Sequence, residues 1–166
     1  PCLHILYIIH RMILSHTSKL AIQALIYMAT QPPGVAILNR TIAEKLGASP
    51  TYLAKILQSL CKFNLLYSSR GNQGGFCLRE NGNKINLLQI ILVIEGPGIE
   101  DACVLGFKVC SDTKPCLMHE RWAPIRHEIV KLLKSQNLES LASEVLTGKR
   151  LISDFPVFSL DKKNNM

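Results

Sequence analysis

The stretch IAEKLGASPTYLAKILQSL, residues 42–60, contains two short helix patterns separated by Gly47. Apolar residues recur on both sides of that glycine at the three- and four-residue spacing of a helix: Ile42, Ala43 and Leu46, then Leu53, Ile56, Leu57 and Leu60. Asn39 and Ser49 are positioned to cap the two helices, and Pro50 occupies the first position of the second. Two short helices joined by such a turn predict a helix-turn-helix.

The segments on either side extend this unit. Before it, apolar spacing over residues 15–30 predicts a longer helix that QPPG, residues 31–34, terminates. After it, residues 65–69 and 76–79 read as two short strands around the glycine-rich tip RGNQGG. A hairpin in that place is the wing of a winged helix-turn-helix.

The second half of the chain is again helical in pattern. Helices are predicted over residues 86–95, 120–135 and 138–146, and a loop of about 20 residues separates the first two. The predicted fold class is therefore mainly α with a small β wing, a winged helix-turn-helix domain followed by a long helix.

Five segments follow from this pattern. Residues 1–11 form an N-terminal arm, residues 12–95 the winged helix-turn-helix domain, and residues 96–118 a loop that carries three cysteines. Residues 119–148 form a region with a long helix, and residues 149–166 a C-terminal tail.

The composition narrows the class of function. The formal charge is +7 and the isoelectric point about 9.2, which favours an anionic partner such as nucleic acid. No apolar run approaches the length of a membrane span, and no leader pattern is present, so we expect a cytoplasmic protein without a membrane partner. The sequence shows no nucleotide loop, nucleophile–base motif or paired carboxylates, so neither an enzyme nor a small-molecule substrate is expected.

The positive charge is concentrated on the helix-turn-helix and the wing. Residues 37–80 carry six basic and two acidic side chains. A recognition helix that begins at Ser49 would enter the major groove of double-stranded DNA with its N-terminal residues near the bases. The candidate DNA-binding residues are Ser49, Thr51, Tyr52 and Lys55 on that helix, and Arg70, Gly71, Gly74 and Gly75 at the wing.

A second candidate site lies in CVLGFKVCSDTKPCLMH, residues 103–119. Three cysteines and one histidine fall in this stretch, at intervals wider than the paired knuckles of most zinc sites. Three thiolates and an imidazole make a full ligand set for an iron–sulfur cluster, whereas a structural zinc ion or ordinary packed thiols are the alternatives. Cys61 and Cys77 are expected to be packed thiols instead.

Five motifs together resemble the Rrf-two family of winged helix-turn-helix transcriptional regulators. The motifs are MILSHTSKLAIQALIYMA, IAEKLGASPTYLAKILQSL, SSRGNQGGFCL, INLLQIILVIEG and CLMHERW, between Met12 and about Leu146. Within that family the chain is most similar to the regulators that sense iron–sulfur clusters, and second to those that respond to nitric oxide.

The resemblance implies a ligand set and a partner. Cys103, Cys110, Cys116 and His119 would bind a 2Fe-2S cluster, or a 4Fe-4S cluster in the nitric-oxide-responsive alternative. The chain would form a homodimer through the long helix that begins near His119, and the cluster would modulate operator binding. By the same resemblance, residues 12–95 would be the DNA-binding domain, residues 96–118 the cluster-binding loop and residues 119–148 the dimerisation helix region. Lys19 stands where nitric-oxide sensors can place an acidic ligand, which disfavours that alternative.

Overall fold

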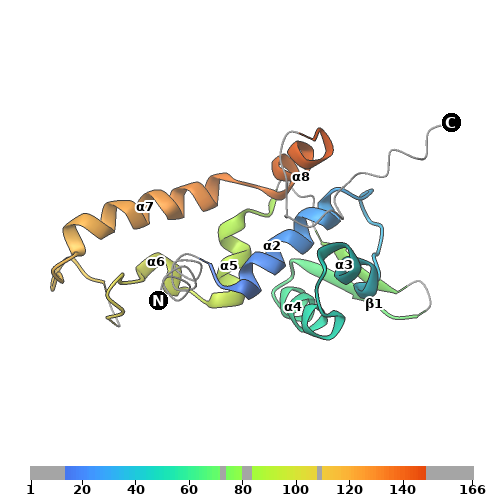
Figure 1. Cartoon of the computed structure of the whole chain (residues 1–166), viewed down its shortest axis with the longest axis horizontal. Coiled ribbons are helices and arrows are strands. Elements are labelled where there is room, and N and C mark those ends of the chain that lie inside the picture. The colour runs from blue at the N-terminus through green and yellow to red at the C-terminus, as the bar shows by residue number, and fades with distance from the viewer. Residues whose placement is uncertain (1–13, 72–73, 80–83, 108–109, 149–166) are drawn as a thin grey trace, which may run out of the picture.

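The computed structural model describes residues 14–71, 74–79, 84–107 and 110–148 (Figure 1). The predicted arm and tail lie outside the described residues. The helices and strands follow the order α2 (His16–Ala29), α3 (Asn39–Leu46), α4 (Pro50–Lys62), β1 (Leu66–Ser69), β2 (Gly75–Leu78), α5 (Leu87–Glu95), α6 (Gly98–Asp101), α7 (His119–Ser135) and α8 (Leu138–Leu146). This arrangement confirms the predicted fold class, mainly α with one two-stranded wing.

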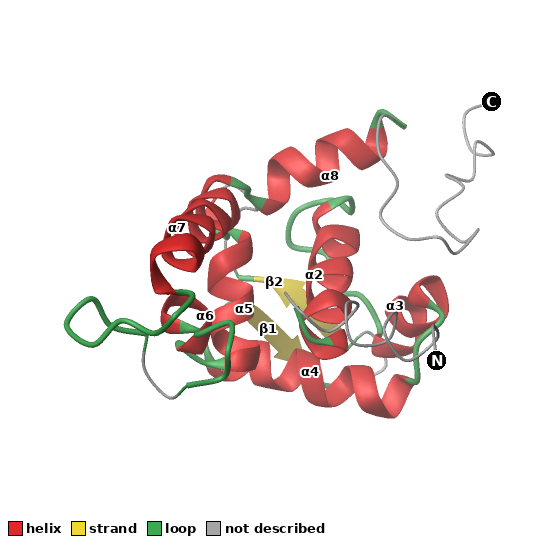
Figure 2. Cartoon of the chain, turned by 60° about the vertical axis from the view of Figure 1, so that its left-hand side comes forward, coloured by secondary structure: helices red, strands yellow, loops and turns green. Residues whose placement is uncertain are grey.

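Helix α2 lies at the centre of the fold. The hydroxyl of Ser15 caps it by accepting a hydrogen bond from the backbone N–H of Ser18. The helix packs against α3, α4, α5, α8 and β2, and Figure 2 shows it surrounded by these elements. Its apolar face is fully inside the core: Leu20, Ala21, Ala24, Leu25 and Met28.

Helices α3 and α4 form the predicted helix-turn-helix. Gly47 ends α3 in the left-handed conformation, with φ of 60°, which glycine adopts without steric cost. The prediction that Asn39 caps α3 is wrong, because Leu38 holds the cap position. The Asn39 side chain instead donates to the carbonyl oxygen of Pro50 over 2.9 Å and so ties the two helices together. Ser49 precedes α4 at the cap position without a capping hydrogen bond from its side chain.

The wing is an antiparallel pair, with Leu66 opposite Leu78 and Ser69 opposite Gly75. Ile37 joins its base by exchanging two backbone hydrogen bonds with Phe76, of 2.8 and 2.9 Å. At Gly75, where φ is 157°, a Cβ would lie 2.4 Å from the carbonyl oxygen of Ile37. The close approach of these two backbones therefore requires glycine.

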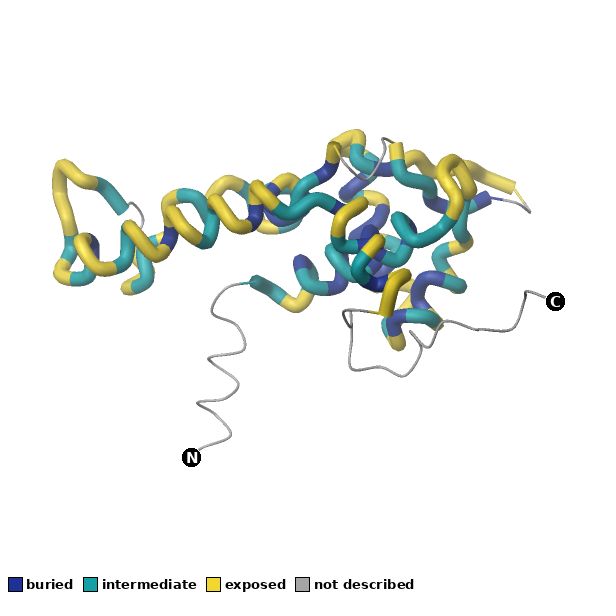
Figure 3. The backbone as a smooth tube through the Cα atoms, turned by 90° about the horizontal axis from the view of Figure 1, so that it is seen from above, coloured by how far each residue is buried: buried dark blue, intermediate teal, exposed yellow. Residues whose placement is uncertain are grey.

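The second half of the chain carries a long, thinly covered helix. Asn86 and Gln89 form a capping box that starts α5. The segment predicted as a loop from residue 96 onward contains the single helical turn α6. Helix α7 then extends away from the core, and most of its surface is exposed along its length (Figures 1 and 3). Helix α8 returns to pack on α2.

Within the described ranges, no helix has both the length and the apolar character needed to cross a bilayer.

We expect Gly75→Ala to destabilise the fold by about 1–3 kcal/mol, because the new methyl group overlaps the backbone of Ile37 at a strained φ. Gly98→Ala is the matched control, since a Cβ there meets nothing within 4 Å and its φ is not positive. Urea unfolding of both variants measures the difference. Equal unfolding midpoints for the two would contradict the packing described for the wing.

Candidate functional site

The first half of the site is the face of the winged helix-turn-helix unit, residues 39–79. Leu53, Ile56, Leu57 and Leu60 turn one side of α4 into the core. Ser49, Thr51 and Lys55 therefore lie together on its opposite, exposed side near the N-terminal end. This end of a recognition helix is the part that approaches base edges in helix-turn-helix proteins.

Tyr52 contacts α2 although its side chain is partly exposed to solvent. Its hydroxyl lies 2.6 Å from the hydroxyl of Thr17, and its ring stacks on that of His16 with centroids 6.3 Å apart. The sequence did not predict this contact, because Thr17 and Tyr52 are 35 positions apart in the chain. The contact orients the first turn of α4 relative to α2.

The glycines of the wing divide into two groups. Arg70 and Gly71 are exposed at the tip, where a DNA groove or phosphate is accessible. Gly74 is buried, and a Cβ there would lie 2.6 Å from the carbonyl oxygen of Ser69. Gly74 and Gly75 thus serve the close packing of the hairpin itself.

The second half of the site is the cysteine loop, residues 102–119, with 108 and 109 outside the described residues. Its four candidate ligands form two close pairs. The Sγ atoms of Cys103 and Cys116 are 3.9 Å apart, and Sγ of Cys110 is 3.3 Å from Nδ1 of His119. The three thiols are half-buried and His119 is buried at the start of α7. Residues 16 positions apart in the chain are thereby brought into one small region.

Asp112 is a functional candidate that sequence analysis missed. Its carboxylate Oδ1 lies 2.7 Å from Nε2 of His119. This contact fixes the imidazole ring with Nδ1 facing the Cys110 thiol. A carboxylate on the far nitrogen of a histidine is the usual outer partner of a metal-binding imidazole.

The thiol of Cys103 has a pKa below its ordinary value. Partial burial raises this pKa, but hydrogen bonds from the backbone N–H groups of Phe107 and Leu105 outweigh that effect. Contacts with the thiols of Cys116 and Cys110 lower it further. The loop backbone is therefore arranged to stabilise a thiolate, the form of cysteine that binds metals.

The donor set fits an iron–sulfur cluster in its chemistry. Thiolates and an imidazole are the ligands such clusters use. In the arrangement shown, and among the described residues, no three His, Cys, Asp or Glu side chains converge as a site for one metal ion. The four candidate ligands form two pairs, Cys103 with Cys116 and Cys110 with His119. The other ring nitrogen of His119 contacts Asp112.

The cysteine loop is fastened to α7 at its first residue. The carbonyl oxygen of Ala102 accepts a hydrogen bond of 2.7 Å from Nε1 of Trp122. The buried guanidinium of Arg126 lies 3.5 Å from the same oxygen through Nη1. Each contact joins residues that are twenty or more positions apart in the sequence. The apolar spacing that predicted α7 therefore could not predict them.

A further contact joins the end of α5 to the start of α2. Glu95, the last residue of α5, accepts a hydrogen bond of 2.9 Å from the backbone N–H of Ser15. Burial raises the pKa of the Glu95 carboxyl, but hydrogen bonds from Ser18 and from the backbone and hydroxyl of Ser15 outweigh it and leave the pKa below its ordinary value. The carboxylate is thus held in its charged form at the N-terminus of α2.

The other cysteines lie away from this loop. Cys61 lies in α4 and Cys77 in β2, and both are half-buried free cysteines. Burial raises the pKa of Cys61 despite a hydrogen bond from Ser68. Their placement matches packed thiols.

Comparison with known proteins identifies the family of this chain. The family model Rrf2, described as an iron-dependent transcriptional regulator, matches residues 14–144. A candidate HTH-type transcriptional regulator of Aquifex aeolicus is 29% identical over 132 residues, which cover 78% of this chain and 91% of that protein. The HTH-type transcriptional regulator IscR of Photorhabdus laumondii is 26% identical over 130 residues, covering 78% and 79% respectively.

A solved structure shows the same fold. CymR, the global cysteine regulator of B. subtilis, superposes with a TM-score of 0.67 at 29% identity, and the match covers 78% of this chain and 95% of that one. The relatives are transcriptional regulators, and the family match spans most of the chain. The protein therefore belongs to the Rrf2 family of winged helix-turn-helix transcriptional regulators.

Proposed function

We propose that this regulator binds double-stranded DNA as a homodimer, and that an iron–sulfur cluster on Cys103, Cys110, Cys116 and His119 modulates its grip on the operator. One observation carries the proposal. The structure gathers three thiols and one imidazole, and no other cysteine that it describes, into a single loop beside the start of α7.

The loop offers what a cluster requires of a protein. Backbone hydrogen bonds lower the pKa of the Cys103 thiol, which favours its thiolate, and Asp112 contacts His119. Two ligand pairs suit a group of several metal atoms better than a single ion, and a 2Fe-2S cluster needs no further ligand than these four. When bound, such a cluster supplies a redox-active centre whose charge depends on its oxidation state.

The DNA contact falls to the exposed side of α4 and to the wing tip. Ser49 and Thr51 offer hydroxyl groups to base edges, while Lys55 and Arg70 offer positive charge to phosphates or to a minor groove. Tyr52, already bound to Thr17, serves mainly to orient α4.

Helix α7 supports pairing with a second copy. Ile125 and Leu132 are more than half exposed and lie seven positions apart, which places them on one side of the helix. The half-buried Ile129 lies between them on the same stripe. A second α7 would cover this apolar stripe, as in other paired helices.

A chain of contacts connects the cysteine loop with the recognition helix. Glu95 stands directly before the segment that leads to the loop and binds the N-terminus of α2 through Ser15. Two residues further, Thr17 binds Tyr52 on α4. A change in the loop that displaces Glu95 would therefore shift the N-terminus of α2. The contact between Thr17 and Tyr52 would then shift the first turn of α4.

We expect protein purified without oxygen to show the visible absorption of an iron–sulfur cluster. Cys103→Ala, Cys110→Ala and Cys116→Ala should each remove most of it, because each deletes one of four ligands. Cys61→Ala and Cys77→Ala are the matched controls and should retain the spectrum.

Two results would overturn the assignment of the cluster. Colourless protein that contains zinc would show that the loop is a structural zinc site, since zinc has no visible charge-transfer band. Equal loss of colour in the control variants would show that the cluster is not bound by this loop.

We expect Lys55→Ala and Arg70→Ala to weaken binding to a mixed-sequence duplex and to lower the dependence of log K on log salt concentration by about one unit each. Lys131→Ala on α7 is the control, because its side chain is exposed on a helix outside the winged helix-turn-helix unit. Titration by fluorescence anisotropy at several salt concentrations gives the slopes. A slope unchanged in Arg70→Ala would remove the wing from the interface.

We expect Glu95→Ala to lower the free energy of unfolding at neutral pH relative to the natural chain. Because the folded pKa of Glu95 is lowered, its contribution is complete above the unfolded pKa and disappears as pH falls through the folded pKa. Urea unfolding between pH 7 and about pH 3 should therefore show the two proteins converging in acid. Glu128→Ala, an exposed glutamate on α7, serves as control. A difference between natural chain and Glu95→Ala that is independent of pH would exclude the carboxylate as the stabilising group.

A further inference from the structure

Three polar side chains are buried among the residues that the structure describes: Ser18, His119 and Arg126. Two of them have good hydrogen-bond partners. Ser18 binds the carboxylate of Glu95, and His119 has a partner on each ring nitrogen. Arg126 is the exception, because its Nε atom is buried without a hydrogen-bond partner in the described part of the chain.

The guanidinium of Arg126 is held by one long contact. The residue is 7% exposed, and the hydrogen bond found for it runs over 3.5 Å from Nη1 to the carbonyl oxygen of Ala102. None of the ion pairs among the described residues includes it. A guanidinium stays charged in proteins, and burying a charge without a partner is strongly unfavourable. The described chain therefore contains a buried positive charge that nothing in it compensates.

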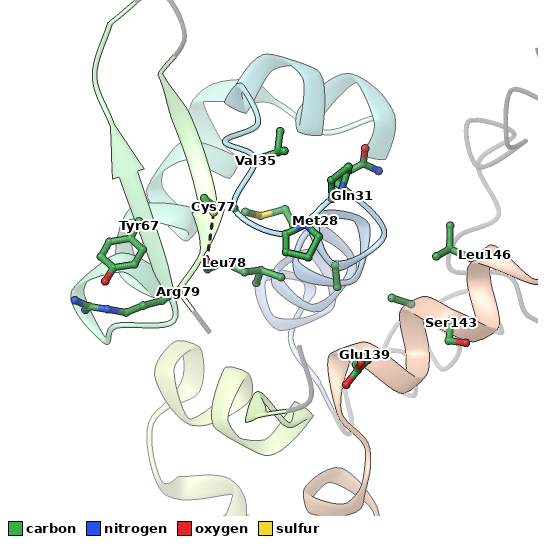
Figure 4. Close-up of a pocket in the computed structure, with 15 residues that line it drawn as sticks. Met28, Gln31, Val35, Tyr67, Cys77, Leu78, Arg79, Glu139, Ser143 and Leu146 are labelled. Carbon is green, nitrogen blue, oxygen red and sulfur yellow. Dashed lines mark hydrogen bonds between the residues drawn. The ribbon is translucent and has the colours of Figure 1, made fainter. Parts of the chain in front are cut away.

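The other arginines that the structure describes lie at the surface. Arg79 illustrates the difference. It lines the groove between the wing and α8, packs 4.3 Å from the centre of the Tyr67 ring and donates to Asn64 (Figure 4). Solvent and salt screen a charge in such an exposed position. Among the described arginines, burial without a charged partner is confined to Arg126.

This charge lies beside the first cysteine of the loop. Ala102 directly precedes Cys103, and covalent geometry keeps a cysteine sulfur within about 6 Å of the preceding carbonyl oxygen. Nη1 of Arg126 therefore lies no more than about 9 Å from the sulfur of Cys103. The sulfur of Cys116 is 3.9 Å from that of Cys103. Two of the four proposed cluster ligands are thus close to the buried charge.

A 2Fe-2S cluster on the proposed ligands would be an anion. Three thiolates, two sulfides and two ferric ions leave one net negative charge, since the imidazole is neutral. Uptake of one electron adds a second negative charge. A cation at this distance in a buried region stabilises both forms, and it stabilises the reduced form more, because the attraction grows with the charge.

We propose that Arg126 supplies the counter-charge of the cluster and raises its reduction potential. The inference rests on the proposed function, because it requires the cluster on the four ligands. It also explains why an unpaired guanidinium is kept below the surface: its partner arrives with the cluster. In the iron-free chain the charge remains uncompensated, so cluster binding relieves a cost that the fold otherwise bears.

Redox titration of the cluster-loaded full chain tests the counter-charge. Dithionite supplies one electron, which converts one ferric ion to ferrous without breaking a bond, and the visible absorption follows the reduction. Arg126→Gln removes the charge but keeps an amide donor. It should favour the oxidised form about tenfold, which is a reduction potential lower by about 59 mV. Arg126→Lys keeps the charge and should change the potential much less.

Lys131→Gln is the matched control for the titration. It removes an exposed positive charge from the same helix, so solvent screening should leave the potential nearly unchanged.

Urea unfolding of the iron-free chain gives a second readout. Without the cluster, Arg126→Gln should be at least as stable as Arg126→Lys, because it buries no unpaired charge. In the loaded chain the order should reverse. Arg126→Gln should then lose its visible absorption to an iron chelator faster than Arg126→Lys does.

Four results would overturn the inference, and a fifth concerns the proposed function. A potential unchanged in Arg126→Gln would exclude the counter-charge. Equal shifts in the Gln and Lys variants of Arg126 would assign the effect to the lost contact with Ala102, and an equal shift in Lys131→Gln would assign it to net charge. Iron-free Arg126→Gln that is less stable than Arg126→Lys would show that the guanidinium already has a partner, such as a carboxylate of a second copy. A natural chain without iron–sulfur absorption would instead refute the proposed function, and this inference with it.

Discussion

The attachment of the cysteine loop to helix α7 at both ends is the constraint on which the rest of the site depends. At one end Trp122 and Arg126 hold the carbonyl of Ala102, and at the other His119 is buried in the first turn of the helix. A loop of this length without such anchors would spread its thiols over many conformations, and ordering them on a ligand would cost conformational entropy. Because both ends of the loop are fixed to one helix, Cys103 stays close to Cys116, and Cys110 stays close to His119.

The same molecule places its DNA-binding surface at a distance from that loop and connects the two through α2. This helix packs against nearly every element of the winged helix-turn-helix unit, and its N-terminus binds both Glu95 and Tyr52. A rigid central helix with two such contacts at one end can transmit a small displacement of the loop region to α4.

The fold was predictable from the sequence because its helices carry strong apolar periods and its turns carry glycine and proline. The cap of α3 was not predictable, because the Asn39 side chain donates to the carbonyl oxygen of Pro50 instead of capping its own helix. Likewise the cysteines and His119 could be named from the sequence, but their pairing and the role of Asp112 could not. Those features depend on contacts between side chains that no local pattern specifies, as do Trp122 on Ala102 and Glu95 on Ser15.

The most direct test of the account is the DNA affinity of a single oxygen-free preparation, measured before and after its iron is removed, with iron and acid-labile sulfide determined in each sample. The account predicts about two iron and two sulfide per chain at first, and a dissociation constant that changes when both are lost. A preparation free of iron and sulfide, or an affinity that is the same in both samples, would contradict it.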